Sequence, residues 1–175
     1  MCTLLSVVLI LSLAASPLAA QTKAWTKYKN TNGNFTVLFP GEPADSVNKT
    51  GEGVQSHTLL AKDGSVIYTV IYTAMTSAQT VDEATFQVFK KAVFNELPKC
   101  EAGAEQALPA MEGYIGHGYR LSCNMPNTTV TIVGNLYWGK HYAFAVMTMF
   151  PASVAEPTST EKQFADSFGV VDPAK

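Results

Sequence analysis

The stretch that decides the fold runs from residue 114 to residue 150 and reads YIGHGYRLSCNMPNTTVTIVGNLYWGKHYAFAVMTMF. It contains three runs rich in β-branched and aromatic residues, and short turn-forming segments separate these runs. The third run is apolar on both faces, and strands of this kind are normally covered on both sides. We therefore predict an antiparallel meander whose last strand lies at the centre of the sheet. The three predicted strands are 114–123, 128–138 and 141–150.

Upstream of the meander, a hairpin is predicted around the dipeptide Asp63-Gly64. Asp-Gly between two β-rich runs favours a tight turn, because it adopts positive φ angles at little cost. The polar stretch 41–53 is interpreted as a loop with room for one edge strand. The strands expected before the meander are 25–28, 35–39, 54–61 and 65–73.

Two amphipathic segments, 80–97 and 159–168, predict helices. Thr80 and Glu83 match a capping box at the start of the first helix, and Pro98 ends its pattern. The second helix places Phe164 and Phe168 one turn apart. We expect the aromatic stripe of the first helix to pack on the sheet. This stripe consists of Phe86, Phe89, Val93 and Leu97, with Phe94 at its edge.

Residues 21–175 contain no linker, repeat or low-complexity segment, which predicts a single domain. The chain is 47% hydrophobic, enough for a core, and its net charge of −2 excludes a strongly basic nucleic-acid-binding protein. The expected fold class is α+β, an antiparallel β-sheet meander flanked by helices.

Residues 1–20 are typical of a secretory signal peptide. A short apolar run ends in small residues, which predicts cleavage between Ala20 and Gln21. The alternative is an uncleaved anchor, because the first residues carry no Lys or Arg, but the apolar run is shorter than the roughly 20 residues of a spanning helix. We expect a secreted or periplasmic protein without stable membrane insertion after signal cleavage.

Cysteine usage agrees with export. Two cysteines, Cys100 and Cys123, remain after removal of the leader, and a disulfide between them would close a loop of about 24 residues. Two free thiols, or half of a metal site, are the alternatives that the sequence leaves open.

Two short motifs resemble a known family. Gly33-Asn-Phe-Thr-Val-Leu-Phe-Pro40 and Phe164-Ala-Asp-Ser-Phe168 are similar to segments of the PsbP/Mog-like (DcrB-like) family of small secreted proteins. The resemblance would cover about residues 25–170, and it implies an α/β/α sandwich with the sheet between helices. Known members assist photosystem II or bind the Ran GTPase, but the matching motifs are structural and carry neither role to this chain.

Signatures of common hydrolases, metalloproteases and nucleotide-binding proteins are absent from the sequence. The three histidines, His57, His117 and His141, fall on separate predicted strands, and nothing in their spacing demands a metal. Glu101 and Glu105 are expected to be solvated in a loop region after Cys100. We therefore name no catalytic residue, cofactor or metal ligand.

Two functional hypotheses remain. The first is an exported, non-catalytic domain that binds an unidentified protein partner or supports envelope assembly. The second is a small-molecule carrier or hydrolase with a pocket between the sheet and the long helix, which would need a cavity of roughly 300 Å³ or more.

Overall fold

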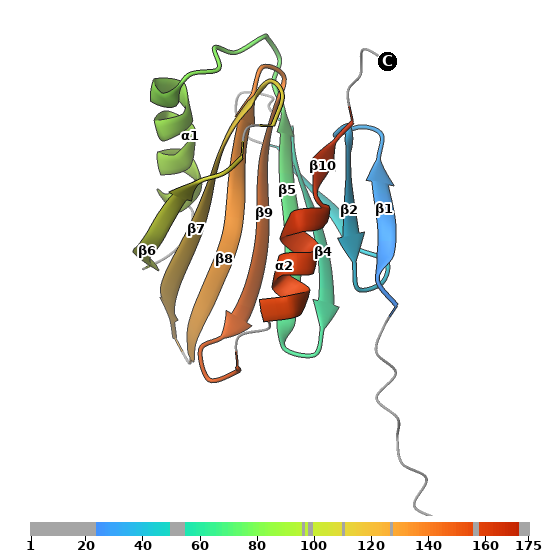
Figure 1. Cartoon of the computed structure of the whole chain (residues 1–175), viewed down its shortest axis with the longest axis vertical. Helices are drawn as coiled ribbons and strands as arrows, with labels where there is room; N and C mark the ends of the chain where they lie inside the picture. The colour runs from blue at the N-terminus through green and yellow to red at the C-terminus, as the bar shows by residue number, and fades with distance from the viewer. Residues whose placement is uncertain are drawn as a thin grey trace, which may run out of the picture.

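The computed structural model describes residues 24–49, 55–95, 97, 100–109, 111–126, 128–155 and 158–171 (Figure 1). The expected signal peptide and its cleavage site between Ala20 and Gln21 lie outside the described residues. The described ranges form ten strands and two helices. These are β1 (Thr26–Asn30), β2 (Phe35–Phe39), β3 (Ala44–Lys49), β4 (Gln55–Asp63), β5 (Val66–Ala74), α1 (Glu83–Asn95), β6 (Cys100–Ala107), β7 (Tyr114–Met125), β8 (Thr128–Gly139), β9 (Tyr142–Pro151), α2 (Thr158–Ser167) and β10 (Gly169–Val170).

The strands form two antiparallel sheets. The larger sheet has the order β3-β4-β5-β9-β8-β7-β6, and the smaller has the order β1-β2-β10. The predicted meander is confirmed as β7, β8 and β9, and the predicted hairpin as β4 and β5. Gly64 in the hairpin turn has a φ angle of 58°, a conformation that glycine adopts without steric cost. As predicted, β9 is the central strand of the larger sheet.

The predicted α+β sandwich, with one sheet flanked by helices, is wrong. Strand accounts for 59% of the structure and helix for 16%, so the fold is β-rich. One face of the seven-stranded sheet carries α1, whereas the small sheet together with α2 covers part of the other (Figure 1). The reason is that β2 presents the fully buried Phe35, Val37 and Phe39 to the larger sheet. A second sheet thus supplies much of the cover that the prediction and the family resemblance assigned to helices.

Two separate apolar cores lie on the two faces of the seven-stranded sheet. The first lies between the small sheet with α2 and strands β4, β5, β8 and β9; its largest side chains are Phe35, Phe39, Tyr68, Tyr72, Phe144, Phe164 and Phe168. The second lies beneath α1; it contains Phe86, Tyr119, Leu121, Cys123, Ile132, Leu136, Ala145 and Met147. The predicted aromatic stripe of the first helix is therefore confirmed as core.

Helix α1 begins later than predicted, because Asp82 caps it. The Asp82 Oδ1 atom accepts a hydrogen bond from the Thr85 backbone N–H at 2.8 Å, the geometry of an N-cap. The predicted capping pair of Thr80 and Glu83 is therefore wrong. The Thr80 carbonyl oxygen instead accepts hydrogen bonds from the Thr85 hydroxyl and the Trp138 indole N–H.

The strand β6 was not predicted. Its sequence, CEAGAEQA, has no β-branched or aromatic residue, so its own propensity gives no strand signal. Pairing with β7 imposes the extended conformation, and this pairing is interrupted between Ala102 and Glu105 by a β-bulge. The edge strand allowed for within 41–53 is present as β3.

Neither helix found within the described ranges is both long and apolar enough to cross a bilayer.

Candidate functional site

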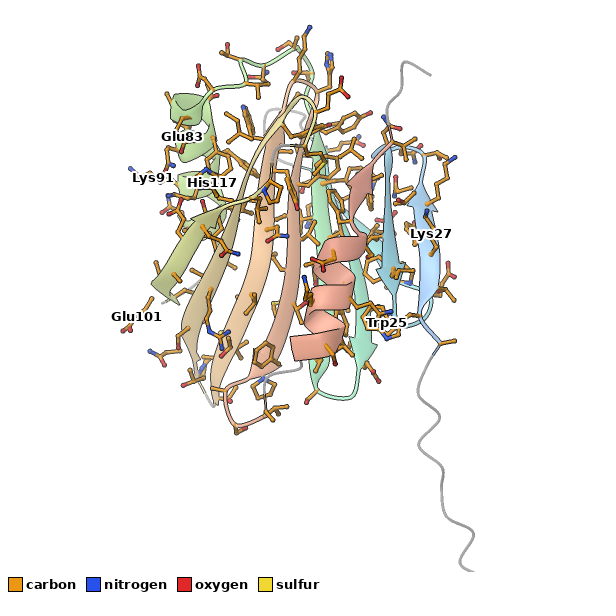
Figure 2. The ribbon with its side chains drawn as sticks, in the orientation of Figure 1. Trp25, Lys27, Glu83, Lys91, Glu101 and His117 are labelled. Atoms are coloured by element: carbon orange, nitrogen blue, oxygen red, sulfur yellow. A yellow bond between two sulfur atoms is a disulfide. The ribbon has the colours of Figure 1, made fainter. Side chains whose placement is uncertain are left out.

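A cluster of ionisable side chains lies where α1 packs against β6 and β7. Glu83 and Lys90 come from α1, Glu105 comes from β6, and His117 and Tyr119 come from β7. Figure 2 shows Glu83 and His117 close together at this junction. We call these five residues the α1–β7 cluster.

The cluster is centred on Glu105. Its Oε1 atom lies 2.9 Å from His117 Nδ1 and accepts a hydrogen bond from the Tyr119 hydroxyl at 3.1 Å. Its Oε2 atom lies 3.2 Å from Lys90 Nζ. The second nitrogen of the imidazole, His117 Nε2, lies 3.5 Å from Glu83 Oε2. The Glu105 carboxylate thus contacts three donor side chains, two from β7 and one from α1.

Aromatic contacts hold the imidazole in place. The His117 ring stacks on Phe86 with centroids 4.6 Å apart and an interplanar angle of 24°. Phe86 is fully buried, whereas the His117 side chain keeps an exposed fraction of 16%. The imidazole is therefore oriented by its packing and still reachable by solvent.

The electrostatics follow from these contacts. Partial burial raises the pKa of the Glu105 carboxyl, but hydrogen bonds from Lys90, Tyr119 and His117 outweigh it and hold the pKa below its ordinary value. Burial raises the pKa of the Tyr119 phenol, and the hydrogen bond to Glu105 raises it further. Tyr119 therefore remains a neutral donor and Glu105 a charged acceptor.

The geometry of the cluster does not fit a single metal ion. Glu105 and Glu83 face opposite nitrogens of the same imidazole, so no point lies within coordination distance of all three groups. Among the residues that the structure describes, no group of three or more His, Cys, Asp or Glu side chains is arranged to hold one. Because both ring nitrogens face carboxylates, neither is placed to activate a hydroxyl or thiol nucleophile. The α1–β7 cluster links helix α1 to strands β6 and β7 at the edge of the sheet.

Glu105 was expected to be solvated in a loop region; it is exposed, but it lies on strand β6 and contacts His117, Tyr119 and Lys90. Once β6 is known to pair with β7, the register places Glu105 opposite Tyr119 and near His117. The signal that could have revealed the cluster is the spacing of Glu83 and Lys90 along α1, which places both on one face of the helix.

The other two histidines lie away from this cluster. His57 on β4 stacks on Tyr72 at 4.7 Å, and its Nδ1 atom lies 3.5 Å from Asp45 Oδ1. His141 lies exposed in the connection between β8 and β9, and its carbonyl oxygen accepts a hydrogen bond from the Met75 N–H. The structure does not bring the three histidines together.

Cys100 and Cys123 form the predicted disulfide. The two residues lie directly opposite each other on β6 and β7, so the bond fixes the first residue of β6 to its neighbouring strand. The alternatives of free thiols or half of a metal site therefore do not apply to this pair.

Opposite α1, the small sheet and α2 pack on β4, β5, β9 and part of β8. The sheet surface beyond them, over β6, β7 and the rest of β8, is not covered by another described element (Figure 1). We call this surface the open face. Register and alternation define its residues as Gln106, Gly118, Arg120, Ser122, Thr131, Val133 and Asn135.

Two neighbouring hollows lie on the open face. One has a volume of about 250 Å³ and is lined by residues that include Glu101, Gly103 and Thr131. The other has a volume of about 170 Å³ and is lined by residues that include Ala104 and Gln106. Arg120 lines both hollows, so they form one continuous, shallow surface of mixed polar and apolar character.

Among the described residues, little space is left between α1 and the sheet. The space lined by Phe94, Tyr119 and Met147 there has a volume of about 10 Å³, which is room for about one water molecule. A bound small molecule needs several hundred cubic ångströms. The space beneath α1 therefore gives no support to a carrier or hydrolase with a pocket in that place.

Comparison with known proteins gives no further assignment: no protein-family model matches the chain, and no curated protein matches it significantly.

Proposed function

We propose that this chain is an exported, non-catalytic domain that binds a protein partner through the open face, in an extracellular or periplasmic compartment. The observation that carries the proposal is the pair of shallow hollows that meet at Arg120 on the part of the sheet that no other described element covers. A surface of this shape and polarity suits a protein contact better than a small ligand, which is usually enclosed in a deeper apolar pocket.

Two further features support export. The Cys100–Cys123 disulfide suits an oxidising compartment, where such bonds form and persist. The pattern of residues 1–20 is that of a cleaved leader. A role in envelope assembly would place the partner in the same compartment.

The resemblance to the PsbP/Mog-like family remains a proposal about ancestry only. The residues that carry it pack together, since Phe35 and Phe39 of β2 contact Phe168 and Phe164 respectively. These contacts explain why both motifs are aromatic, and they assign no activity.

The proposal is tested by comparing two charge insertions in the tagged, full-length chain produced in its own host. Val133→Arg places a cation on the open face, and Val88→Arg places one on an exposed position of α1. Ser122→Arg serves as a second open-face variant in case Val133→Arg disturbs folding.

We expect quantitative mass spectrometry to find one exported protein enriched equally with the unmodified chain and Val88→Arg. Its recovery should fall at least tenfold with the open-face variants, provided their thermal midpoints match that of the unmodified chain. Equal recovery with folded open-face variants, or no specifically enriched exported protein at all, would contradict the proposal.

A further inference from the structure

Strand β6 forms one edge of the seven-stranded sheet, directly beside the open face. We propose that the partner contributes an extended segment that pairs with the free edge of β6 and adds an eighth strand to the sheet. This inference rests on the proposed function and specifies how the partner binds.

The backbone hydrogen bonds show which groups of β6 are available. The Leu108 N–H donates to the Gly116 carbonyl oxygen at 2.9 Å, so this pair is hydrogen-bonded across the two strands. In an antiparallel ladder, hydrogen-bonded and non-hydrogen-bonded pairs alternate. The main-chain N–H and C=O groups of Ala107 and Glu105 therefore point away from β7, toward the free edge. Groups arranged in this way are complementary to the main chain of another strand.

The other edges of the two sheets differ from β6. Proteins often protect edge strands with lysine, and the edge strand β1 carries Lys27 and Lys29. The edge strand β10 has only two residues. Strand β6 has eight residues without lysine or proline, and most of its side chains are small. Its charged residues are Glu101 and Glu105, and its regular pairing is interrupted by the β-bulge between Ala102 and Glu105.

The β-bulge limits where a strand can pair. Gly103 lies at this bulge, and a Cβ atom there would approach the Arg120 carbonyl oxygen to 2.9 Å, which explains why glycine occupies the position. Bulges disturb further pairing at an edge. The regular edge after the bulge, from Ala104 to Ala107, is therefore the segment that we assign to the partner.

One hollow of the open face begins at the regular edge of β6 and extends across β7 to β8. Ala104 and Gln106 of the regular edge line the hollow of about 170 Å³. Alternate side chains of an added strand project to the same face of the sheet, roughly 7 Å apart. In strand addition, main-chain hydrogen bonds provide affinity and pockets for alternate side chains provide specificity. The open face and the edge of β6 thus form one recognition surface.

The test uses a phage-displayed library of random dodecapeptides selected against the purified, disulfide-bonded protein. Recovered peptides are then measured against two variants at one position. Ala107→Pro removes the outward N–H without removing a ladder bond to β7, and proline is tolerated at such edge positions. Ala107→Val keeps the N–H and is the matched control.

We expect selected peptides to slow hydrogen exchange at the Glu105 and Ala107 amides. Their affinity should fall at least tenfold in Ala107→Pro and stay within twofold in Ala107→Val, with both variants retaining the thermal midpoint of the parent. If a lower midpoint shows that Ala107→Pro is misfolded, the exchange measurement on the unmodified protein decides alone.

Peptides that bind elsewhere, that bind Ala107→Pro unchanged, or that cannot be selected at all would overturn the edge pairing. These results would leave the comparison of Val133→Arg with Val88→Arg untouched. Failure of this inference is therefore distinguishable from failure of the proposed function.

Discussion

The Nδ1 atom of His117 lies 2.9 Å from the Oε1 atom of Glu105, which joins β7 to the edge strand β6 beneath helix α1. Glu105 is held at the same time by Lys90 of α1 and by the Tyr119 hydroxyl. The helix, the edge strand and its neighbour are therefore linked through one carboxylate. Since β6 borders the open face, these contacts also fix the surface that we assign to the partner.

Replacing Glu105 by glutamine should lower the free energy of unfolding at pH 7 by about 1 kcal/mol, since the site is partly exposed and its ion pair is screened. The folded-state pKa of Glu105 lies below its ordinary value of 4.5. Its stabilisation is therefore complete above that value and is lost as the pH falls through the folded-state pKa. Urea titrations from pH 7 to pH 3 should show the difference between Glu105→Gln and the parent disappearing with acid.

The control for this prediction is Glu101→Gln on the same strand, where the side chain is exposed. It should change the free energy of unfolding by less than about 0.5 kcal/mol at any pH. An equal effect of the two substitutions would show that Glu105 stabilises the protein only through its contribution to the net charge, not through its contacts with Lys90, His117 and Tyr119.

Replacing both cysteines, Cys100→Ala with Cys123→Ala, should lower the free energy of unfolding by about 3–4 kcal/mol. The reason is that the disulfide joins two residues separated by 23 positions in the sequence and so restricts the unfolded chain. The first amides to lose exchange protection should be those of β6, which is paired on one side only. Dithiothreitol should lower the urea midpoint of the parent and leave that of the double variant unchanged. A parent that is insensitive to dithiothreitol would contradict this role.

Phe86→Ala should destabilise by about 3–5 kcal/mol, since it deletes a fully buried ring that packs on His117 beneath α1. Val88→Ala, two residues along the same helix and 71% exposed, should stay within about 0.5 kcal/mol. Thermal denaturation of both variants checks the pair. Similar midpoints would mean that α1 contributes little to the core.

Mature protein isolated from the exported fraction should begin at Gln21, which intact mass measurement and amino-terminal sequencing both detect. The reason is the apolar run of residues 1–20 and the small residues before the expected cleavage point. Protein that retains residues 1–20 in the membrane fraction would favour the anchor alternative instead.

The sequence predicted well those elements whose pattern of apolar and turn-forming residues matches their place in the fold. Strand β9 has two apolar faces and lies at the centre of the sheet, and the hairpin predicted at Asp63-Gly64 turns at Gly64 and Ser65 between β4 and β5. Strand β6 was missed because its extended conformation comes from pairing with β7, a tertiary effect that single-residue propensities do not contain.

The fold class was predicted wrongly and the α1–β7 cluster was missed for related reasons. Phe35, Val37 and Phe39 alternate as expected of a strand, but the pattern does not say that this strand belongs to a second sheet. Without β6, nothing in the sequence placed Glu105 beside His117. The Cys100–Cys123 pair was predictable because only two cysteines follow residue 20.

Binding of a protein partner to the open face can be tested by site-specific photo-crosslinking in the exported compartment. Benzoylphenylalanine is introduced at Ser122 or Gln106 on the open face, and at Ser46 or Val88 as exposed positions elsewhere. We expect adducts of one common partner from Ser122 and Gln106 and none from Ser46 or Val88. Adducts of that partner from Ser46 or Val88 alone, or no adduct from either open-face position, would contradict this expectation.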